Sequence, residues 1–225
     1  SRGLGDVYKR QIKAPFKGSH QLSFSLLNRI LGNQISPEPY GTLKNTQALN
    51  REIHSNYMYF GNDFYSSFSL ERFETDYGIP GSPEGHINGV DISMYRNTQK
   101  FSFHKDISIG GFQTLDVDQR YIDYSHSESV TKDSYPSVIL SHQILTLNAK
   151  LSGNQKTIGS LLKIRNFQSQ EFYWTPDCKE ISISLYGLSE KNIRNYTLQS
   201  SFRLENNSIV PYVGSEYFYA NLDIN

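Results

Sequence analysis

The residues that most often carry chemistry are scattered through this sequence without the spacing that a reaction or a bound metal requires. No His-Glu-x-x-His pair occurs, and no Gly-x-Ser-x-Gly turn presents a nucleophilic serine. Cys178 is the single cysteine, so neither an internal disulfide nor a thiolate metal cluster can form. We therefore predict a protein that is not an enzyme and holds no cofactor. The histidines are His20, His54, His86, His104, His126 and His142.

The elements that position these residues are predicted to be about ten β-strands, because apolar and polar residues alternate over most of the chain. The clearest case is 196–205, where Leu198, Phe202 and Leu204 lie on one face and Arg203 and Glu205 on the other. No segment of useful length has a helical period. The predicted strands are 20–30, 46–59, 63–74, 89–104, 111–125, 136–149, 155–167, 180–188, 194–206 and 214–223.

The connections between these segments alternate strictly between short and long. Short ones are predicted near 60–62, 105–110, 150–154 and 189–193, and long ones near 31–45, 75–88, 126–135 and 168–179. Outer-membrane barrels have short turns at one end and long loops at the other, whereas sandwiches joined by Greek-key crossovers have no such regularity. A propeller, whose repeat is also near 40 residues, has shorter strands.

Composition agrees with a barrel that has a polar interior. Hydrophobic residues make up 37% and aromatic residues 13% of the chain, and Lys+Arg and Asp+Glu balance at 22 each. Few aliphatic and many aromatic residues suit aromatic girdles around a wet lumen. No cluster of positive charge indicates a nucleic-acid partner. Most charged strand residues fall opposite the apolar face: Glu71, Asp91, Asp116, Asp118, Arg120, Lys163, Arg165, Arg203 and Glu205.

One strand prediction contains an internal conflict. In 89–104, Val90, Ile92 and Met94 alternate with polar residues, but Phe101 and Phe103 are out of phase with them. A β-bulge, which inserts one extra residue into a strand, would place all of these apolar side chains on one face. We therefore expect a bulge in this strand.

A hairpin with a long loop spans residues 64–96, and it carries a resemblance. Tyr77, Gly78, Ile79, Pro80 and Gly81 are followed by a short polar insert, then Gly89 and a Gly-Val-x-Ile-x-Met strand. This order resembles the mid-barrel region of TonB-dependent outer-membrane receptors, in a branch associated with uptake of metals or metal chelates. The resemblance continues through 121–128, YIDYSHSE, to about residue 206.

The resemblance implies that the loop after Gly81 could capture metal with histidine and acidic residues. Glu84 and His86 are the candidates in that loop, with Asp76 nearby. One histidine and two carboxylates make a poor site, and exposed loop polarity explains them better. The long-loop aromatic residues Tyr40, Phe172, Tyr173 and Trp174 are second candidates, for which an interfacial girdle is the preferred interpretation.

The resemblance also implies a function and a larger protein. Residues 1–11 look like a translated sequencing adapter, and 12–225 is expected to be a partial receptor barrel that lacks its plug domain and C-terminal strands. We predict about ten strands of a larger antiparallel up-and-down barrel of 22 strands, which form an open curved sheet in isolation. Such a receptor lies in the outer membrane of a Gram-negative type bacterium, contacts its lipid, and takes up a scarce solute with energy from the TonB complex.

Two other functions remain open from the sequence. One is a passive porin or a small complete outer-membrane barrel, which would close with its first and last strands bonded. The other is a soluble secreted β-rich binding module, which would bury Phe68, Ile183, Leu198 and Phe202 between two stacked layers.

Overall fold

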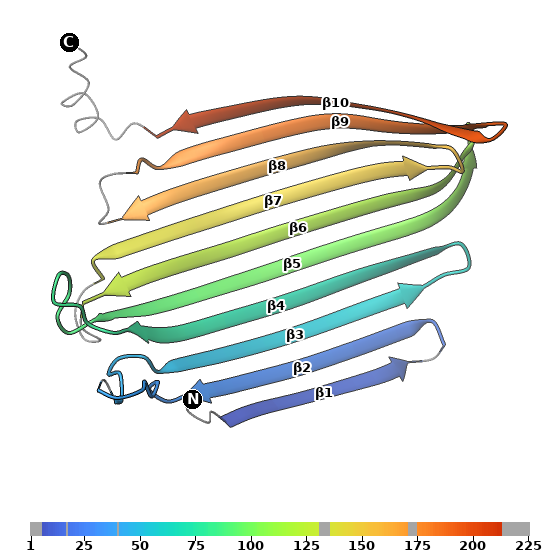
Figure 1. Ribbon diagram of the computed structural model, residues 1–225. Coiled ribbons are helices and arrows are strands. Elements are labelled where there is room, and N and C mark those ends of the chain that lie inside the picture. Colours follow the sequence, from blue (N-terminus) through green and yellow to red (C-terminus); the bar gives the residue numbers. More distant parts are fainter. Residues whose placement is uncertain (1–5, 17, 40, 131–135, 171–174, 213–225) are drawn as a thin grey trace, which may run out of the picture.

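The computed structural model describes residues 6–16, 18–39, 41–130, 136–170 and 175–212, which form one antiparallel sheet of ten strands (Figure 1). Each strand pairs with the strands before and after it in the sequence, so the topology is up-and-down throughout. The strands are β1 (Asp6–Phe16), β2 (His20–Leu31), β3 (Ala48–Phe60), β4 (Phe64–Ile79), β5 (Val90–Ile109), β6 (Phe112–Ser129), β7 (Val138–Ser152), β8 (Lys156–Gln170), β9 (Cys178–Ile193) and β10 (Tyr196–Pro211).

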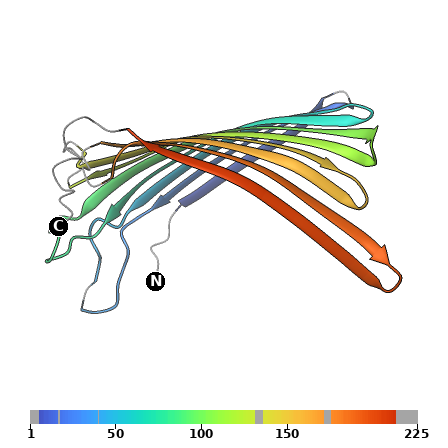
Figure 2. The same ribbon diagram turned by 90° about the horizontal axis from the view of Figure 1, so that it is seen from above.

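The sheet is a single layer that is open at both sides. In the described part of the chain, β1 pairs only with β2 and β10 only with β9. The sheet is strongly twisted (Figure 2). Phe68, Ile183, Leu198 and Phe202 are 42%, 57%, 59% and 49% exposed, so no second layer covers them. The predicted all-β up-and-down sheet with two free edges is confirmed, and a two-layer sandwich is not what the chain forms.

Cross-strand register places most of the apolar side chains near the short turns on one face, here called the apolar face. Starting from Phe68, successive Cα partners across five further strands are Phe101, Gln119, Leu147, Leu162 and Ile183. Because side chains alternate along a strand, the residues between them point to the opposite face, here called the polar face. The non-glycine strand residues that are buried all lie on the polar face, as expected for the inside of a curved sheet: Thr75, Ile92, Thr98, Glu180, Ser182 and Ser184.

The connections follow the predicted alternation. Short turns of two or three residues join β1 to β2, β3 to β4, β5 to β6, β7 to β8 and β9 to β10. The strand ends that the longer connections join lie at the opposite end of the sheet, and these connections span 32–47, 80–89, 130–137 and 171–177. β5 and β6 are the longest strands, at 20 and 18 residues. A strand that crosses a bilayer needs only about 9–11 residues, so β5 and β6 are longer than a bilayer crossing requires.

Two details of the sequence prediction for β5 are wrong. The register between β4 and β5 is continuous from Phe64 opposite Lys105 to Ile79 opposite Val90, so the expected bulge is absent there. Ile92 and Met94 therefore lie on the polar face, whereas Asp91 lies on the apolar face near the long loops. The only irregularity of β5 lies between Asp106 and Ile109, beside the short turn.

The cause of this error is a change of polarity halfway along the wall. Toward the long loops, the apolar face carries a row of cross-strand partners that are all polar, here called the polar collar: Arg72, Asn97, Asp123, Gln143, Asn166 and Lys179. Behind the collar, the polar face carries mostly aromatic residues, with Arg96 among them. Alternation by itself cannot reveal that the two faces exchange character along one strand.

Strands β2 to β10 match nine of the predicted segments. β1 was not predicted, because residues 1–11 were left out of the fold prediction, yet Asp6–Phe16 pairs with β2 over its full length. That residues 1–11 derive from a sequencing adapter stays a prediction. The segment 214–223 lies outside the described residues. Within the described residues, no helix has the length and apolar character needed to cross a membrane.

Candidate functional site

The polar face near the short turns carries a ladder of charged and hydrogen-bonding residues, here called the charged ladder. One row of cross-strand partners runs from Tyr65 through His104, Asp116 and Lys150 to Gly159 and Tyr186. The next row contains Ser102, Asp118 and Asn148. Cross-strand neighbours on one face have Cβ atoms about 5 Å apart, so such rows bring opposite charges into contact.

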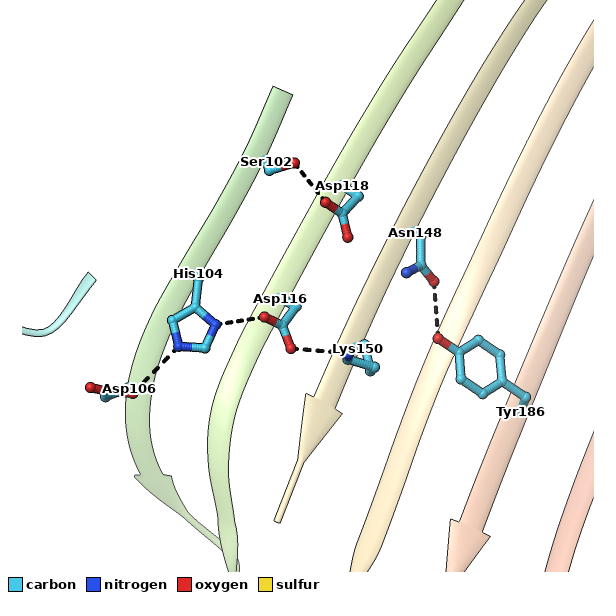
Figure 3. Close-up of polar contacts among 8 residues, drawn as sticks. All are labelled: Ser102, His104, Asp106, Asp116, Asp118, Asn148, Lys150 and Tyr186. Atoms are coloured by element: carbon cyan, nitrogen blue, oxygen red, sulfur yellow. Dashed lines mark hydrogen bonds and ion pairs between the residues drawn. The ribbon is translucent and has the colours of Figure 1, made fainter. Parts of the chain in front are cut away.

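Asp116 is the centre of the first row (Figure 3). Its Oδ1 lies 2.6 Å from His104 Nδ1, and its Oδ2 lies 3.3 Å from Lys150 Nζ. The second ring nitrogen of His104 lies 3.5 Å from Asp106, and the Tyr65 ring stacks on the imidazole with centroids 4.9 Å apart. In the described part of the chain, the His104 ring nitrogens contact carboxylates and no nucleophile. This arrangement holds charge in a defined place.

Two side-chain hydrogen bonds extend the ladder across the sheet, as Figure 3 shows. The Ser102 hydroxyl donates to Asp118 Oδ1 at 2.7 Å, and the Tyr186 hydroxyl donates to Asn148 Oδ1 at 3.0 Å. Tyr186 reaches Asn148, which is two strands away, because its cross-strand partner Gly159 has no side chain in between.

A second group of charges surrounds Glu180 on β9. Its carboxylate oxygens lie 3.2 Å from Lys163 Nζ and 2.8 Å from Arg165 Nε. The Glu180 side chain is only 10% exposed, so the pair of cations compensates a carboxylate that has little contact with water. On β10, Glu205 accepts a hydrogen bond from Ser182 at 3.1 Å and another from Arg203 Nε at 2.9 Å.

The aromatic row behind the polar collar was not anticipated from the sequence. Cross-strand partners Phe73, Arg96, Tyr124, His142 and Phe167 follow one another on the polar face. The centroid of the His142 ring lies 4.8 Å from that of Phe167 and 5.8 Å from that of Tyr124. The Arg96 guanidinium carbon lies 5.7 Å from the centroid of the Phe73 ring. The sequence signal for this row was the change of phase of the apolar residues within 89–104. The bulge hypothesis explained that change wrongly, as an extra residue in the strand.

The glycines of the Tyr77–Gly81 motif have a structural role in this fold. Asn45, in the preceding long loop, donates from its amide to the carbonyl oxygens of Ile79 and Val90 at 2.9 and 3.1 Å. A Cβ at Gly78 or Gly89 would collide with Asn45, and Gly89 has a φ of +85°. The motif thus allows Asn45 of the loop 32–47 to hold together the two ends of the loop 80–89. Nothing in the sequence pairs Asn45 with these glycines, so this contact could be found only in three dimensions.

The predicted metal candidates lie at the same end of the sheet. Glu84 and His86 are exposed in the loop between β4 and β5, and Asp76 is an exposed residue of β4 that accepts a hydrogen bond from Ser93 at 2.6 Å. Among the described residues, no three His, Cys, Asp or Glu side chains gather closely enough to hold a metal ion. Metal capture by these three residues stays a prediction. Tyr40, Phe172, Tyr173 and Trp174 lie outside the described residues.

A single curved sheet with an apolar outside, a charged inside, short turns at one end and long loops at the other has the architecture of a β-barrel wall. Its fold is similar to the FrpB iron transporter from Neisseria meningitidis (F3-3 variant), with a TM-score of 0.70 at 11% sequence identity. The match covers 91% of this chain and 39% of the FrpB chain, so the chain spans well under half of that protein's length. No family model and no curated protein matches the sequence.

Proposed function

We propose that the chain forms part of the wall of an outer-membrane receptor for TonB-energised uptake of a scarce solute. The observation that carries this proposal is the contrast between the two faces near the short turns. Apolar side chains on one face are 37% to 59% exposed at Phe101, Phe68, Ile183 and Leu198, while the other face holds the charged ladder. Covering such a face with lipid releases the free energy that a soluble protein gains by building a core.

In this proposal the charged ladder lines a water-filled interior. A charge in the middle of a lipid-facing wall costs about 2–4 kcal/mol, so the ladder must face water and the apolar face lipid. Solute binding, the plug domain and contact with the inner-membrane TonB complex are proposed for the larger protein of which this chain would be a part. FrpB is an iron transporter, so iron or an iron chelate is the first solute to test.

Accessibility of spin labels tests the proposed placement. Single cysteines at Thr146, Leu147 and Gln143, in a Cys178→Ser background, would carry a nitroxide in the chain reconstituted into phosphatidylcholine vesicles. Relaxation by oxygen should dominate at Leu147, because oxygen concentrates in lipid. Relaxation by a water-soluble nickel chelate should dominate at Thr146 and Gln143. Equal accessibility at Thr146 and Leu147 would contradict a bilayer-spanning wall.

A soluble module and a passive barrel give different results in two further measurements. A soluble module would remain in solution when vesicles are sedimented. A passive barrel would admit solutes without the TonB complex, whereas the proposed receptor, expressed from its complete gene, should lose uptake of the iron chelate when the TonB complex is deleted.

A further inference from the structure

A shallow groove with a volume of about 350 Å³ lies on the apolar face, at the level of the polar collar. Its lining comes from four adjacent strands, β5 to β8, and from Tyr212, which follows β10. The strand residues that line it are Tyr95, Asp123, Ser141, Gln143, Asn166 and Gln168. Gln143 is only two residues from Leu145, so the groove begins about 7 Å further along the strand than the apolar side chains of the same face.

The lining has the chemistry of a site for an uncharged polyol. Three carboxamides, one carboxylate and hydroxyl groups provide both donors and acceptors, which the neighbouring hydroxyl groups of a sugar require. The tyrosine rings add flat apolar surface beside these polar atoms. Among the described residues that line the groove there is no lysine or arginine, which disfavours phosphate, and their one carboxylate is too few for a calcium site.

The polar side-chain atoms of the groove have no hydrogen-bond partners among the described side chains. Within the described residues, none of the seven lining side chains takes part in a side-chain hydrogen bond, although Arg72 lies 5.9 Å from the centroid of the Tyr95 ring. The Oδ1 atom of Asn166 is buried and has no hydrogen-bond partner. Of the five buried side-chain atoms without a hydrogen-bond partner in the described residues, Asn166 Oδ1 alone belongs to the groove lining. A buried acceptor without a partner is costly, so a group bound in the groove that donates a hydrogen bond to it would be favoured.

We infer that this groove binds an uncharged sugar in the headgroup of a membrane glycolipid. The inference rests on the proposed membrane placement, because only then does the groove lie beside the headgroups of the lipids that cover the apolar face. The acyl chains of such a lipid contact Leu145, Leu147 and their neighbours, while its sugar lies against Gln143, Asn166 and Tyr95. Amide groups of Gln143 and Asn166 then bond the sugar hydroxyls.

Photocrosslinking tests this inference on the whole chain. The chain is reconstituted into phosphatidylcholine vesicles that contain digalactosyl diacylglycerol with a diazirine on the terminal sugar, and the crosslinked peptides are identified by mass spectrometry. Crosslinks should concentrate on β6, β7 and β8 around Asp123, Gln143 and Asn166. The double variant Gln143→Leu/Asn166→Leu should reduce them about tenfold, as expected for the loss of two hydrogen bonds.

Matched controls separate this inference from the proposed function. Arg51→Gln changes a polar residue of β3 on the same face, away from the groove, and should leave the yield unchanged. A diazirine in the acyl chain should label Leu145 and Leu147 in every variant. If acyl labelling occurs but sugar crosslinks spread evenly or ignore the double variant, the glycolipid site is wrong; if acyl labelling also fails, the membrane placement is wrong. Competition by free methyl galactoside would show that the groove takes free sugar instead.

Discussion

The ring of Tyr186 lies directly over Gly159, its cross-strand partner on β8, and the hydroxyl group beyond it reaches Asn148 on β7. The ring covers the backbone that the glycine leaves bare, which is the way aromatic residues compensate for glycines in sheets. One side chain thereby ties together three strands of the wall.

A side chain at position 159 should break this contact. In Gly159→Val, the new Cβ meets the Tyr186 ring, which must move away from Asn148. Overpacking of this kind costs about 1–3 kcal/mol, so urea unfolding of the chain in vesicles should shift to lower urea. Gly32→Ala is the control, because a Cβ there has nothing within 4 Å. Equal stability of the two variants would show that the ring does not depend on Gly159.

Removing the carboxylate of Glu180 should destabilise the wall more than removing one at the surface. Glu180→Gln leaves the cations Lys163 and Arg165 facing each other without a compensating charge. Because both cations are about one-third exposed, we expect a loss of about 1–3 kcal/mol, below the cost of a fully buried pair. The control Glu74→Gln breaks pairs with Arg51 and Arg72, which are 58% and 53% exposed, and its cost should be near zero. Urea unfolding compares the two, and a larger loss for Glu74→Gln would contradict the proposed arrangement.

The direction in which a charge points should decide how well it is tolerated. Leu147→Arg places a guanidinium on the apolar face, whereas Thr146→Arg places it on the polar face one residue away. The first should reduce the stability of the reconstituted chain by about 2–4 kcal/mol and the second by little. Reversible unfolding in vesicles of defined composition measures both variants, and similar costs would contradict a lipid-facing apolar side.

The amide of Asn45 should control the opening of the loop at 80–89. Asn45→Asp keeps the shape but removes the donor to Ile79 and Val90, each hydrogen bond contributing about 0.5–1.5 kcal/mol. Amide hydrogen exchange in this loop should accelerate about tenfold. Asn62→Asp, in the short turn before β4, has no side-chain hydrogen bond to lose within the described residues and should leave the exchange unchanged. Unchanged exchange in Asn45→Asp would show that other contacts hold the loop base.

Much of this fold follows from period-two alternation, because alternation reports which face a residue is on without any tertiary contact. Leu198, Phe202 and Leu204 are predicted to share a face with one another, and they do. Ile92 shows the limit of this reasoning. Alternation places it on the polar face, but near the long loops that face carries apolar and aromatic residues, and the point at which its character changes depends on neighbouring strands rather than on its own segment.

The candidate site was less predictable for a similar reason. Asp116 and Lys150 were visible as charges of opposite sign, but their contact depends on the register between β6 and β7. Asn166 gave no signal at all, since an amide in a strand is ordinary until its partners are known. The histidine and acidic residues at Glu84 and His86 stood out in the sequence, yet the described structure brings no third ligand beside them.

The free sides of the sheet have a consequence for handling this chain. β10 is 16 residues long, all of them exposed, so it presents an unpaired row of amide and carbonyl groups along about 54 Å. A second molecule can pair its own edge strand with that row. At high concentration we therefore expect the purified chain to grow into ladders of many copies, and capping the margin with a matching peptide should keep it monodisperse.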